Sequence, residues 1–154
     1  PRYNYIIGHR MRGGGWYPDA QLRLLRADRA RYDPARPVHE TVILEGDAGL
    51  LKEHLIHYNY DSLAQFRAKQ NRYLTFEARM LYEQGVRPRP VSYLSMPLRE
   101  FWRRYVSLQG YRDGALGLLL CGLMGWYKFK AYRELVRLCR AQEGSPDTAG
   151  ASAA

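Results

Sequence analysis

The stretch Asp61–Gly85, DSLAQFRAKQNRYLTFEARMLYEQG, divides the chain into a part whose pattern predicts strands and a part whose pattern predicts helices. Asp61 or Ser62 can cap a helix, because a short side-chain oxygen accepts a hydrogen bond from a free backbone N–H of the first turn. Apolar side chains then recur at helical spacing, at Leu63, Phe66, Tyr73, Met80 and Leu81. Gly85 provides a stop, and the prolines that follow it cannot continue the helix. One long helix is therefore expected here.

Two further helices are expected on the C-terminal side of this stretch. The first spans Pro97–Leu108 and ends at Gly110. The second runs over Gly114–Ala141, with Asp113 as its candidate N-cap. The sheet-forming part of the chain therefore ends near Tyr60, and the part that follows is expected to be helical.

On the N-terminal side the pattern changes to short runs that are typical of strands. Gln21–Arg26 alternates well enough to form one strand. Thr41–Leu44 and Leu50–Tyr58 flank the turn residues Glu45–Gly49 and predict a β-hairpin. The expected fold class is α/β, or α+β for the isolated chain, with short antiparallel strands followed by three helices.

The chain is divided into three parts on this basis. Residues 1–60 form the strand region, residues 61–143 form the helical region, and residues 144–154 are small and polar and are expected to be disordered. Cys121 and Cys139 lie in the helical region, without a CxxC neighbour or a metal-ligand spacing to histidine. This pattern predicts reduced, buried thiols in a cytosolic protein.

Size and charge set limits on the class of protein. The 154 residues suit one domain with a modest core. Lysine and arginine outnumber aspartate and glutamate by 24 to 15, and this net charge of +9 favours an anionic partner. Nucleic acid, an acidic lipid surface and a phosphorylated substrate all meet that requirement. The first residue is Pro1 and no signal-peptide pattern follows it, so an interior fragment of a longer protein is expected.

An ordered set of segments resembles the bacterial family 2 glycosyltransferases, above all those that add sugars to the lipopolysaccharide core or related envelope glycans. The segments are GGGWYPDAQLRLLR at 13–26, PVHE at 37–40 and LIHY at 55–58. FWRRY at 101–105 and GYRDG at 110–114 look like the C-terminal helices of the same group. The resemblance covers roughly residues 3 to 138 and implies the C-terminal half of a GT-A fold, with residues 1–60 on the acceptor side.

The resemblance implies an inverting, hexosyltransferase-type reaction from a nucleotide-diphosphate sugar to a lipid-linked or envelope glycan acceptor. In such enzymes a carboxylate takes the proton of the acceptor hydroxyl, while Mg²⁺ or Mn²⁺ neutralises the departing diphosphate. The family's donor half, with its Asp-x-Asp metal motif, has no counterpart here, because no Asp-x-Asp occurs in the 154 residues. We therefore expect the missing N-terminal donor-binding half to be required, and the chain by itself to be inactive.

Glu40 lies where the family places its acidic motif, and the resemblance makes it the first candidate for the base. Thr41 stands where the usual pattern has an aspartate, which keeps Asp19 as an alternative. His57 lies where GT-A enzymes carry a late histidine that helps to hold the metal. Each has a structural alternative: a solvated carboxylate for Glu40, a turn cap for Asp19, and a hydrogen-bonded histidine on a half-buried strand for His57.

Five more residues are candidates for contacts with donor phosphate or acceptor sugar: Arg23, Arg26, Trp16, Tyr17 and His39. Arginines form bidentate contacts with phosphate, although arginines on an exposed strand face are commoner. Aromatic rings can stack on a sugar face or pack in a core beneath the glycine-rich turn. His54 lies three residues before His57 and is expected to be a surface residue that faces the other way.

The helical region also has features of a membrane surface. The apolar run Ala115–Tyr127 is too short to span a bilayer, which needs about twenty such residues. The run is preceded by an apolar stripe next to arginines 99, 103 and 104, made of Leu98, Phe101, Trp102, Tyr105 and Val106. Arginine-rich helices with aromatic flanks suit an anionic membrane surface, which predicts a cytoplasmic protein that is peripheral on the inner face of the cell membrane. Packing on the missing donor half, or a dimer interface, is the alternative.

Two rival functions remain at this stage. A basic nucleic-acid-binding module is supported by the net charge and by thirteen tyrosines, which can act as stacking platforms. Against it, the basic residues are dispersed and no DNA- or RNA-binding signature is present, so no nucleic-acid partner is expected. The third possibility is a non-catalytic helical domain that docks on a membrane.

Overall fold

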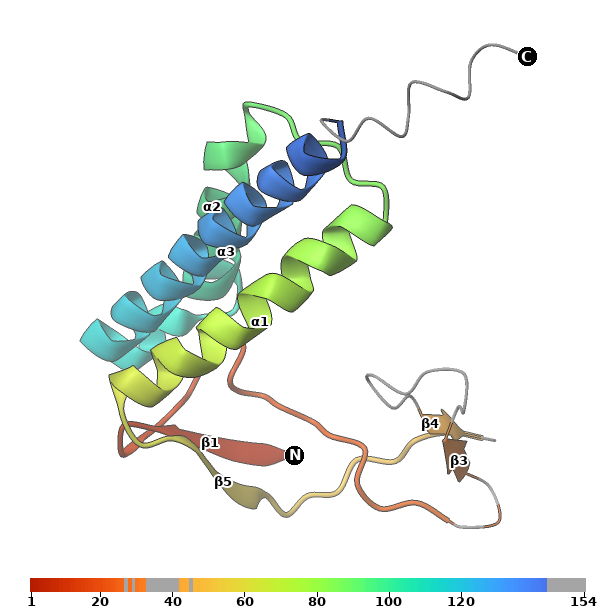
Figure 1. Ribbon diagram of the computed structural model, residues 1–154. Coiled ribbons are helices and arrows are strands. Elements are labelled where there is room, and N and C mark those ends of the chain that lie inside the picture. Colours follow the sequence, from red (N-terminus) through yellow and green to blue (C-terminus); the bar gives the residue numbers. More distant parts are fainter. Residues whose placement is uncertain (27, 29, 33–41, 45, 144–154) are drawn as a thin grey trace.

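A computed structural model describes residues 1–26, 28, 30–32, 42–44 and 46–143 of the chain. Its elements are two small β-sheets and three long helices, arranged as a mixed α/β fold (Figure 1). The first sheet has the strand order β2–β1–β5, formed by His9–Arg10, Arg2–Ile6 and Leu55–Tyr60. The second sheet pairs β3 (Ala30–Tyr32) with β4 (Val42–Leu44) in antiparallel fashion. The expected mixed fold class is confirmed.

The predicted hairpin between residues 41–44 and 50–58 is wrong. β4 pairs with β3, and β5 pairs in parallel with β1, so the first sheet is not purely antiparallel. Five residues of β1 pair in register with β5, whereas β4 has only three residues to offer as a partner. The longer tertiary pairing therefore outweighs the local turn signal at residues 45–49. The segment Gln21–Arg26 is not a strand either, since within the described residues it has no ladder partner.

A tight turn joins β1 to β2. Tyr5 pairs with Arg10 and Ile6 with His9, which leaves Ile7 and Gly8 as a two-residue connection. Both central residues have positive φ, +52° for Ile7 and +74° for Gly8, as a type I′ turn requires. Positive φ is costly for a β-branched side chain, so Ile7 is held there by the pairing on either side of it.

The first helix agrees with its prediction. α1 spans Leu63–Glu83, and the Ser62 side chain accepts a hydrogen bond from the backbone N–H of Gln65 at 3.2 Å. Ser62 is therefore the N-cap. Beyond the helix, Gly85 adopts φ +71°, a conformation that glycine reaches without steric cost.

The second helix begins earlier than expected. α2 spans Ser92–Trp102, with Pro97 inside it, and continues through a π-helical turn, η1, at Arg103–Ser107. Tyr93 and Met96 pack against buried residues of α3, and this packing stabilises a helical turn before the proline. The helix prediction therefore located the right element and placed its start too late.

A short 3₁₀ turn, η2 (Gly110–Asp113), leads into α3 (Gly114–Glu143). Asp113 is not the predicted cap: its buried carboxylate accepts hydrogen bonds from the backbone N–H groups of Arg12 and Gly13, at 2.8 and 3.0 Å. His9 lies 2.9 Å from the same carboxylate. The carboxylate is thus used to attach the start of α3 to the N-terminal loop.

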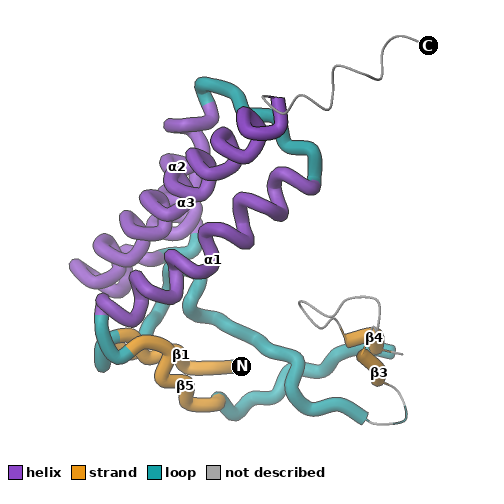
Figure 2. The backbone as a smooth tube through the Cα atoms, viewed as in Figure 1, coloured by secondary structure: helices purple, strands orange, loops and turns teal. Residues whose placement is uncertain are grey.

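The three helices lie side by side above the β1–β5 sheet, and β3 and β4 lie away from them (Figures 1 and 2). One core cluster joins the sheet to the helices through Ile6, Met11, Trp16, Tyr60, Phe66, Leu120, Cys121 and Tyr127. A second cluster, centred on Tyr132 and Leu135, lies among the helices. Cys121 and Cys139 are buried and free, which confirms the prediction of buried, unpaired thiols. No helix among the described residues has both the length and the apolar character needed to cross a membrane.

Candidate functional site

Two of the sequence candidates, Asp19 and His57, are both hydrogen-bonded to a third residue, Asn4, which the sequence analysis did not identify. Asn4 of β1 is 1% exposed, and its register partner on β5 is His57. The Asn4 side-chain nitrogen donates to an Asp19 carboxylate oxygen at 2.7 Å, and the Asn4 side-chain oxygen lies 2.7 Å from His57 Nδ1. Alternation along Arg2–Ile6 places Asn4 on the same side as the buried Ile6, so recognition of this strand would have pointed to it.

The Asn4 amide orients the His57 ring. Its Nδ2 also donates to the backbone oxygen of Trp16 at 2.7 Å, and both partners of this nitrogen can only accept. The amide oxygen must therefore face His57. Since that oxygen can only accept, His57 Nδ1 donates the hydrogen, and Nε2 of the neutral ring presents its lone pair.

Both oxygens of the Asp19 carboxylate accept hydrogen bonds. Arg2 donates to it from Nε and Nη2 at 2.9 and 2.6 Å, and Gln21 donates to its other oxygen at 2.6 Å. Partial burial raises the pKa of Asp19, but hydrogen bonds from Asn4, Gln21 and Arg2 outweigh burial and hold that pKa below its usual value. A general base works best with a pKa near the working pH, so this environment suits an orienting carboxylate better than a base.

The environment of His57 favours its neutral form. Burial and the positive charge of Arg2 lower the pKa of His57, with smaller contributions from Lys69 and Arg23, against the opposing charge of Asp19. A neutral imidazole with one nitrogen bonded to an oxygen is the usual state of a histidine metal ligand. The donor chemistry of His57 therefore fits a metal.

Among the residues with a described placement, further metal ligands are not gathered beside His57. Within the residues that the structure describes, no three His, Cys, Asp or Glu side chains are close enough to hold a metal ion together. Glu40 and His39 lie outside the described residues. The described part of the site therefore offers His57 as one ligand, and any others must come from elsewhere.

The aromatic candidates separate into two kinds. Trp16 is buried in the core, with the Arg104 guanidinium 5.2 Å from its ring centroid. Core packing is therefore the role of Trp16 in this structure. Tyr17 is half-buried and stacks with Tyr3 and His54, at centroid distances of 5.7 and 6.0 Å. His54 stacks on Tyr3 at 4.1 Å and is half-buried, so the expected surface residue is partly packed against an aromatic ring.

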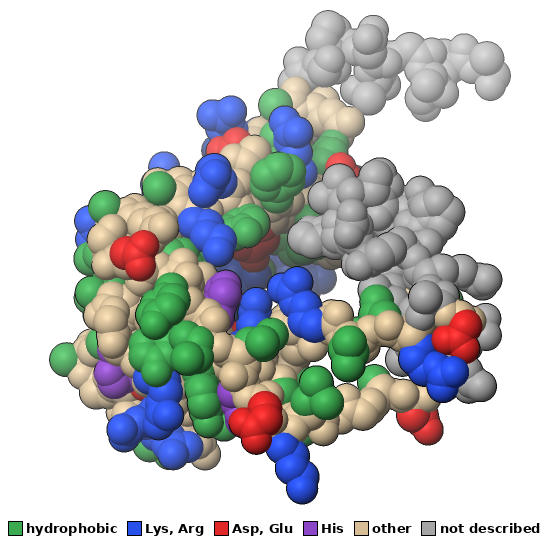
Figure 3. Space-filling view, turned by 90° about the horizontal axis from the view of Figure 1, so that it is seen from below, with side chains coloured by type: hydrophobic (Ala, Val, Ile, Leu, Met, Phe, Trp, Pro, Cys, Tyr) green, Lys and Arg blue, Asp and Glu red, His purple; other side chains and the backbone are tan. Residues whose placement is uncertain are grey.

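The two candidate arginines are exposed. Arg26 pairs with Asp28 at 3.0 Å, on the segment that leads to β3. The positive charge of Arg23 is the smallest of the influences that lower the pKa of His57. The view from the sheet side shows basic, histidine and hydrophobic side chains mixed over this face (Figure 3). The structure therefore joins Asp19 and His57 through Asn4 and keeps Arg26 on its own ion pair.

The chain is similar to a protein of known role. The lipopolysaccharide core biosynthesis glycosyltransferase LpsC of Rhizobium meliloti (strain 1021) is 32% identical to it over 131 residues. The aligned part covers 81% of this chain and 44% of LpsC, so the chain spans less than half the length of this curated relative. No family model matches the chain. No solved structure matches it either. The similarity supports a relationship to glycosyltransferases and does not favour a nucleic-acid-binding module.

Proposed function

We propose that this chain is the acceptor-side part of a family 2, GT-A glycosyltransferase that acts on a lipopolysaccharide core or a related envelope glycan. Similarity to LpsC over 81% of the chain supports the general activity. The observation that carries the site is the hydrogen bond from His57 Nδ1 to the buried Asn4 oxygen, which leaves Nε2 available on a fixed ring.

In the proposed reaction a hexose is transferred with inversion from a nucleotide-diphosphate donor. Bound Mg²⁺ or Mn²⁺ would neutralise the charge of the departing diphosphate. His57 Nε2 would hold that ion, Asn4 would fix the ring, and the positive charge of Arg23 would favour the approach of the donor phosphates. The remaining ligands and the nucleotide pocket belong to the donor-binding half of the intact protein, and the chain by itself is inactive in this proposal.

Glu40 is the proposed base. The alternative, Asp19, holds four hydrogen bonds from Arg2, Asn4 and Gln21, and its pKa is lowered. A carboxylate in that state takes up a proton poorly at neutral pH. Asp19 is therefore assigned an orienting role, in which it holds Asn4 against His57.

The proposed acceptor is lipid-linked, so the protein would work in the cytoplasm, on the inner face of the cell membrane. Residues 1–60 would complete the catalytic domain, and residues 61–143 would form the support on which it rests. The core that joins Ile6 and Tyr60 to Phe66 and Leu120 supports a fixed connection between the two parts.

The test is an activity assay on the full natural protein. Sugar transfer and donor hydrolysis are measured with Mn²⁺ or Mg²⁺ for the wild type, Glu40→Gln, Asp19→Asn and His57→Ala. Glu40→Gln is expected to abolish turnover while donor binding survives. His57→Ala is expected to weaken the response to metal, and Asp19→Asn to reduce turnover partially. Wild-type activity in all three variants would place the site elsewhere.

A further inference from the structure

A cavity of about 270 Å³ lies between the three helices, and we call it the inner cavity. α1 and α2 both pack on α3, and the lining of the inner cavity comes from all three helices and from the π-helical turn η1. Pockets of about 300–1,000 Å³ take drug-sized ligands, so a cavity just below this range can hold a single sugar ring. Asn4, Asp19 and His57 are not among the described residues that line it.

Three cations and two carboxylates of the described chain line the inner cavity, and each of them has a partner. Arg103 and Arg104 donate to Glu100 at 2.9 and 2.6 Å, and Lys128 pairs with Glu77. Burial raises the pKa of Glu100, but the hydrogen bonds from Arg103 and Arg104 outweigh burial and hold that pKa below its usual value. The wall of the cavity therefore carries fixed charges of both signs.

The same lining keeps hydrogen-bonding groups that no described residue uses. Glu77 binds Lys128 through Oε1 and leaves Oε2 as an acceptor. Gln70 donates to the Tyr60 hydroxyl through its nitrogen and leaves its oxygen as an acceptor. Arg104 donates through Nε and Nη1, which leaves Nη2 as a donor. A ligand in the inner cavity would thus meet donors and acceptors together.

This mixture of groups selects the chemistry of the ligand. A phosphate group only accepts hydrogen bonds, and it would lie against the carboxylates of Glu77 and Glu100. A metal ion would lie against three cations instead. A hydroxyl group carries no charge and both donates and accepts. A neutral ring that bears several hydroxyl groups therefore suits the inner cavity.

An aromatic side chain completes the lining on α1. Tyr73 is 51% exposed and lines the inner cavity. The face of an aromatic ring is electron-rich, and it attracts the weakly positive C–H groups on one side of a sugar ring. Tyr73 can therefore stack on a sugar whose hydroxyl groups are bound by the charged residues.

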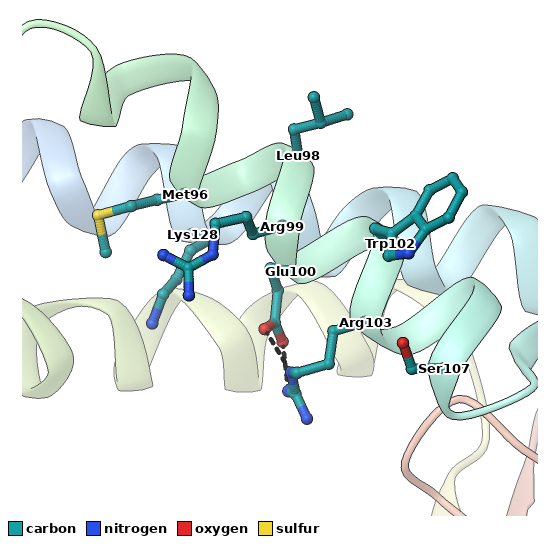
Figure 4. Close-up of a pocket in the computed structure, with 8 residues that line it drawn as sticks. All are labelled: Met96, Leu98, Arg99, Glu100, Trp102, Arg103, Ser107 and Lys128. Carbon is teal, nitrogen blue, oxygen red and sulfur yellow. Dashed lines mark hydrogen bonds and ion pairs between the residues drawn. The ribbon is translucent and has the colours of Figure 1, made fainter.

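A larger cavity of about 810 Å³ adjoins the inner cavity, and we call it the outer cavity (Figure 4). The two cavities share Glu100, Arg103 and Lys128. Glu100 and Arg103 extend from one side of α2, and Leu98 points to the other (Figure 4). Because the cavities meet at shared side chains, a ligand longer than one ring can extend from the inner cavity into the outer cavity.

We propose that the inner cavity binds one neutral sugar ring of a glycan, at a site separate from Asn4 and His57, and that the next ring lies in the outer cavity. The need for a neutral, hydroxyl-rich ligand follows from the lining of the inner cavity. The identification of this ligand as a glycan rests on the proposed function.

Arg104 connects the inner cavity to the candidate site. Its Nη1 donates to the backbone oxygen of Gly14 at 2.8 Å, and its guanidinium lies over the Trp16 ring. The Trp16 backbone oxygen in turn accepts from Asn4. The cavity and the polar site therefore belong to one packed unit, which would hold a bound glycan in a fixed position relative to His57.

The test is a titration of the full natural protein, ¹³C-labelled at its methionine methyl groups, with methyl α-glucoside, methyl α-galactoside and methyl α-mannoside. Met124 lines the inner cavity, Met96 lines the outer cavity, and Met80 lines neither of them. Each methyl signal is assigned by replacing its methionine with leucine. No sugar donor and no metal ion are added, so the readout is independent of turnover.

At least one hexoside is expected to shift the Met124 signal in a saturable way and to leave Met80 unchanged. A disaccharide of the same sugar should shift Met96 as well. Inorganic phosphate should leave Met124 unchanged. A Met124 signal that responds to none of the hexosides, or that responds more strongly to phosphate, would overturn the proposal.

Two variants of the lining have matched controls. Tyr73→Ala removes the exposed ring, and its control is Tyr111→Ala, since Tyr111 is also 51% exposed and lines neither cavity. Glu77→Gln removes a charged acceptor, and its control is Glu83→Gln, an exposed residue of α1 that lines neither cavity. Circular dichroism checks that each variant is folded.

Tyr73→Ala is expected to weaken hexoside binding about fivefold, through the loss of one stacked ring. Glu77→Gln should weaken it about tenfold, through the loss of a hydrogen bond to a charged group. The same variant should now bind inorganic phosphate at Met124, because Lys128 loses its carboxylate partner. Equal losses in the controls, or wild-type hexoside binding by Glu77→Gln, would contradict the site.

Binding and transfer distinguish the two proposals. A protein that binds a hexoside at Met124 but transfers no sugar would leave the inner-cavity site standing and contradict the proposed function. A protein that transfers sugar while Met124 responds to no hexoside would overturn the inner-cavity site and leave the glycosyltransferase proposal standing.

Discussion

Asn4 and His57 are 53 residues apart in sequence and are joined side by side by a 2.7 Å hydrogen bond between neighbouring parallel strands. The Asn4 side-chain nitrogen donates to two groups that can only accept, so the Asn4 side-chain oxygen must face His57. Because that oxygen can only accept, Nδ1 of His57 carries the hydrogen. The chemical state of the proposed metal ligand is thus determined by a buried amide on another strand.

Removing the Asn4 amide should release the His57 ring. In ¹⁵N spectra of histidine-labelled protein, with His57 assigned through His57→Gln, the wild type should show hydrogen on Nδ1 and none on Nε2. Asn4→Ala should give a mixture of both tautomers. It should also lower the free energy of unfolding by about 2 kcal/mol, since buried polar partners lose their hydrogen bonds. A wild-type ring with hydrogen on Nε2 would contradict the arrangement.

Asp19 should make folding stability depend on acid pH. Its pKa in the folded chain is lower than the unfolded value of 3.8, so its contribution is complete above that value and is lost as the pH falls through the folded pKa. Urea unfolding at pH 7 and near pH 3 should show a smaller pH dependence for Asp19→Asn than for the wild type. An unchanged dependence would mean that Asp19 is not held by Arg2 and Asn4 in solution.

The β1–β2 turn should become more stable when Ile7 is replaced. Asparagine tolerates positive φ far better than isoleucine, for which this conformation costs about 1–2 kcal/mol. Ile7 is 40% exposed, so little burial is lost. Ile7→Asn is expected to raise the free energy of unfolding by about 1 kcal/mol, measured by urea denaturation. A fall in stability would show that the contacts of the isoleucine side chain outweigh the backbone cost.

Two glycines of α3 should respond in opposite directions to the same substitution. A Cβ on Gly117 would meet the Gly110 carbonyl oxygen and would lie 2.9 Å from the Asp113 Cβ, whereas a Cβ on Gly122 would meet nothing within 4 Å. Gly117→Ala should therefore destabilise the protein by about 1–3 kcal/mol through overpacking. Gly122→Ala should stabilise it by up to about 1 kcal/mol, because alanine has the higher helix propensity. Thermal melts that move the same way for both would contradict the close approach at Gly117.

Local signals in the sequence predicted the helices well and the sheet poorly. The cap at Ser62 and the apolar spacing of α1 act within one helix, so sequence reasoning found them. The partner of β5 is β1, at the other end of the strand region, and no local pattern specifies that pairing. The turn signal at residues 45–49 led to the wrong hairpin for the same reason.

The candidate site was half predictable. Residue type and family resemblance pointed to Asp19 and His57, and the structure brings them together. Asn4 was missed because its role depends on the β1–β5 register, and Asp113 was misassigned because its partners, Arg12 and Gly13, lie about 100 residues away. Local spacing can show that Asn4 lies on the buried side of its strand, but it does not specify the distant partners of Asn4 or Asp113.

The parallel pairing of β1 with β5 also has a consequence for the order of folding. Helices form from contacts between near neighbours, whereas this pairing must first close a loop that holds most of the first 60 residues. The helical bundle can therefore assemble while Asn4 and His57 are still apart. The polar site would be completed last, so a chain that has lost it can still show a nearly native helical spectrum.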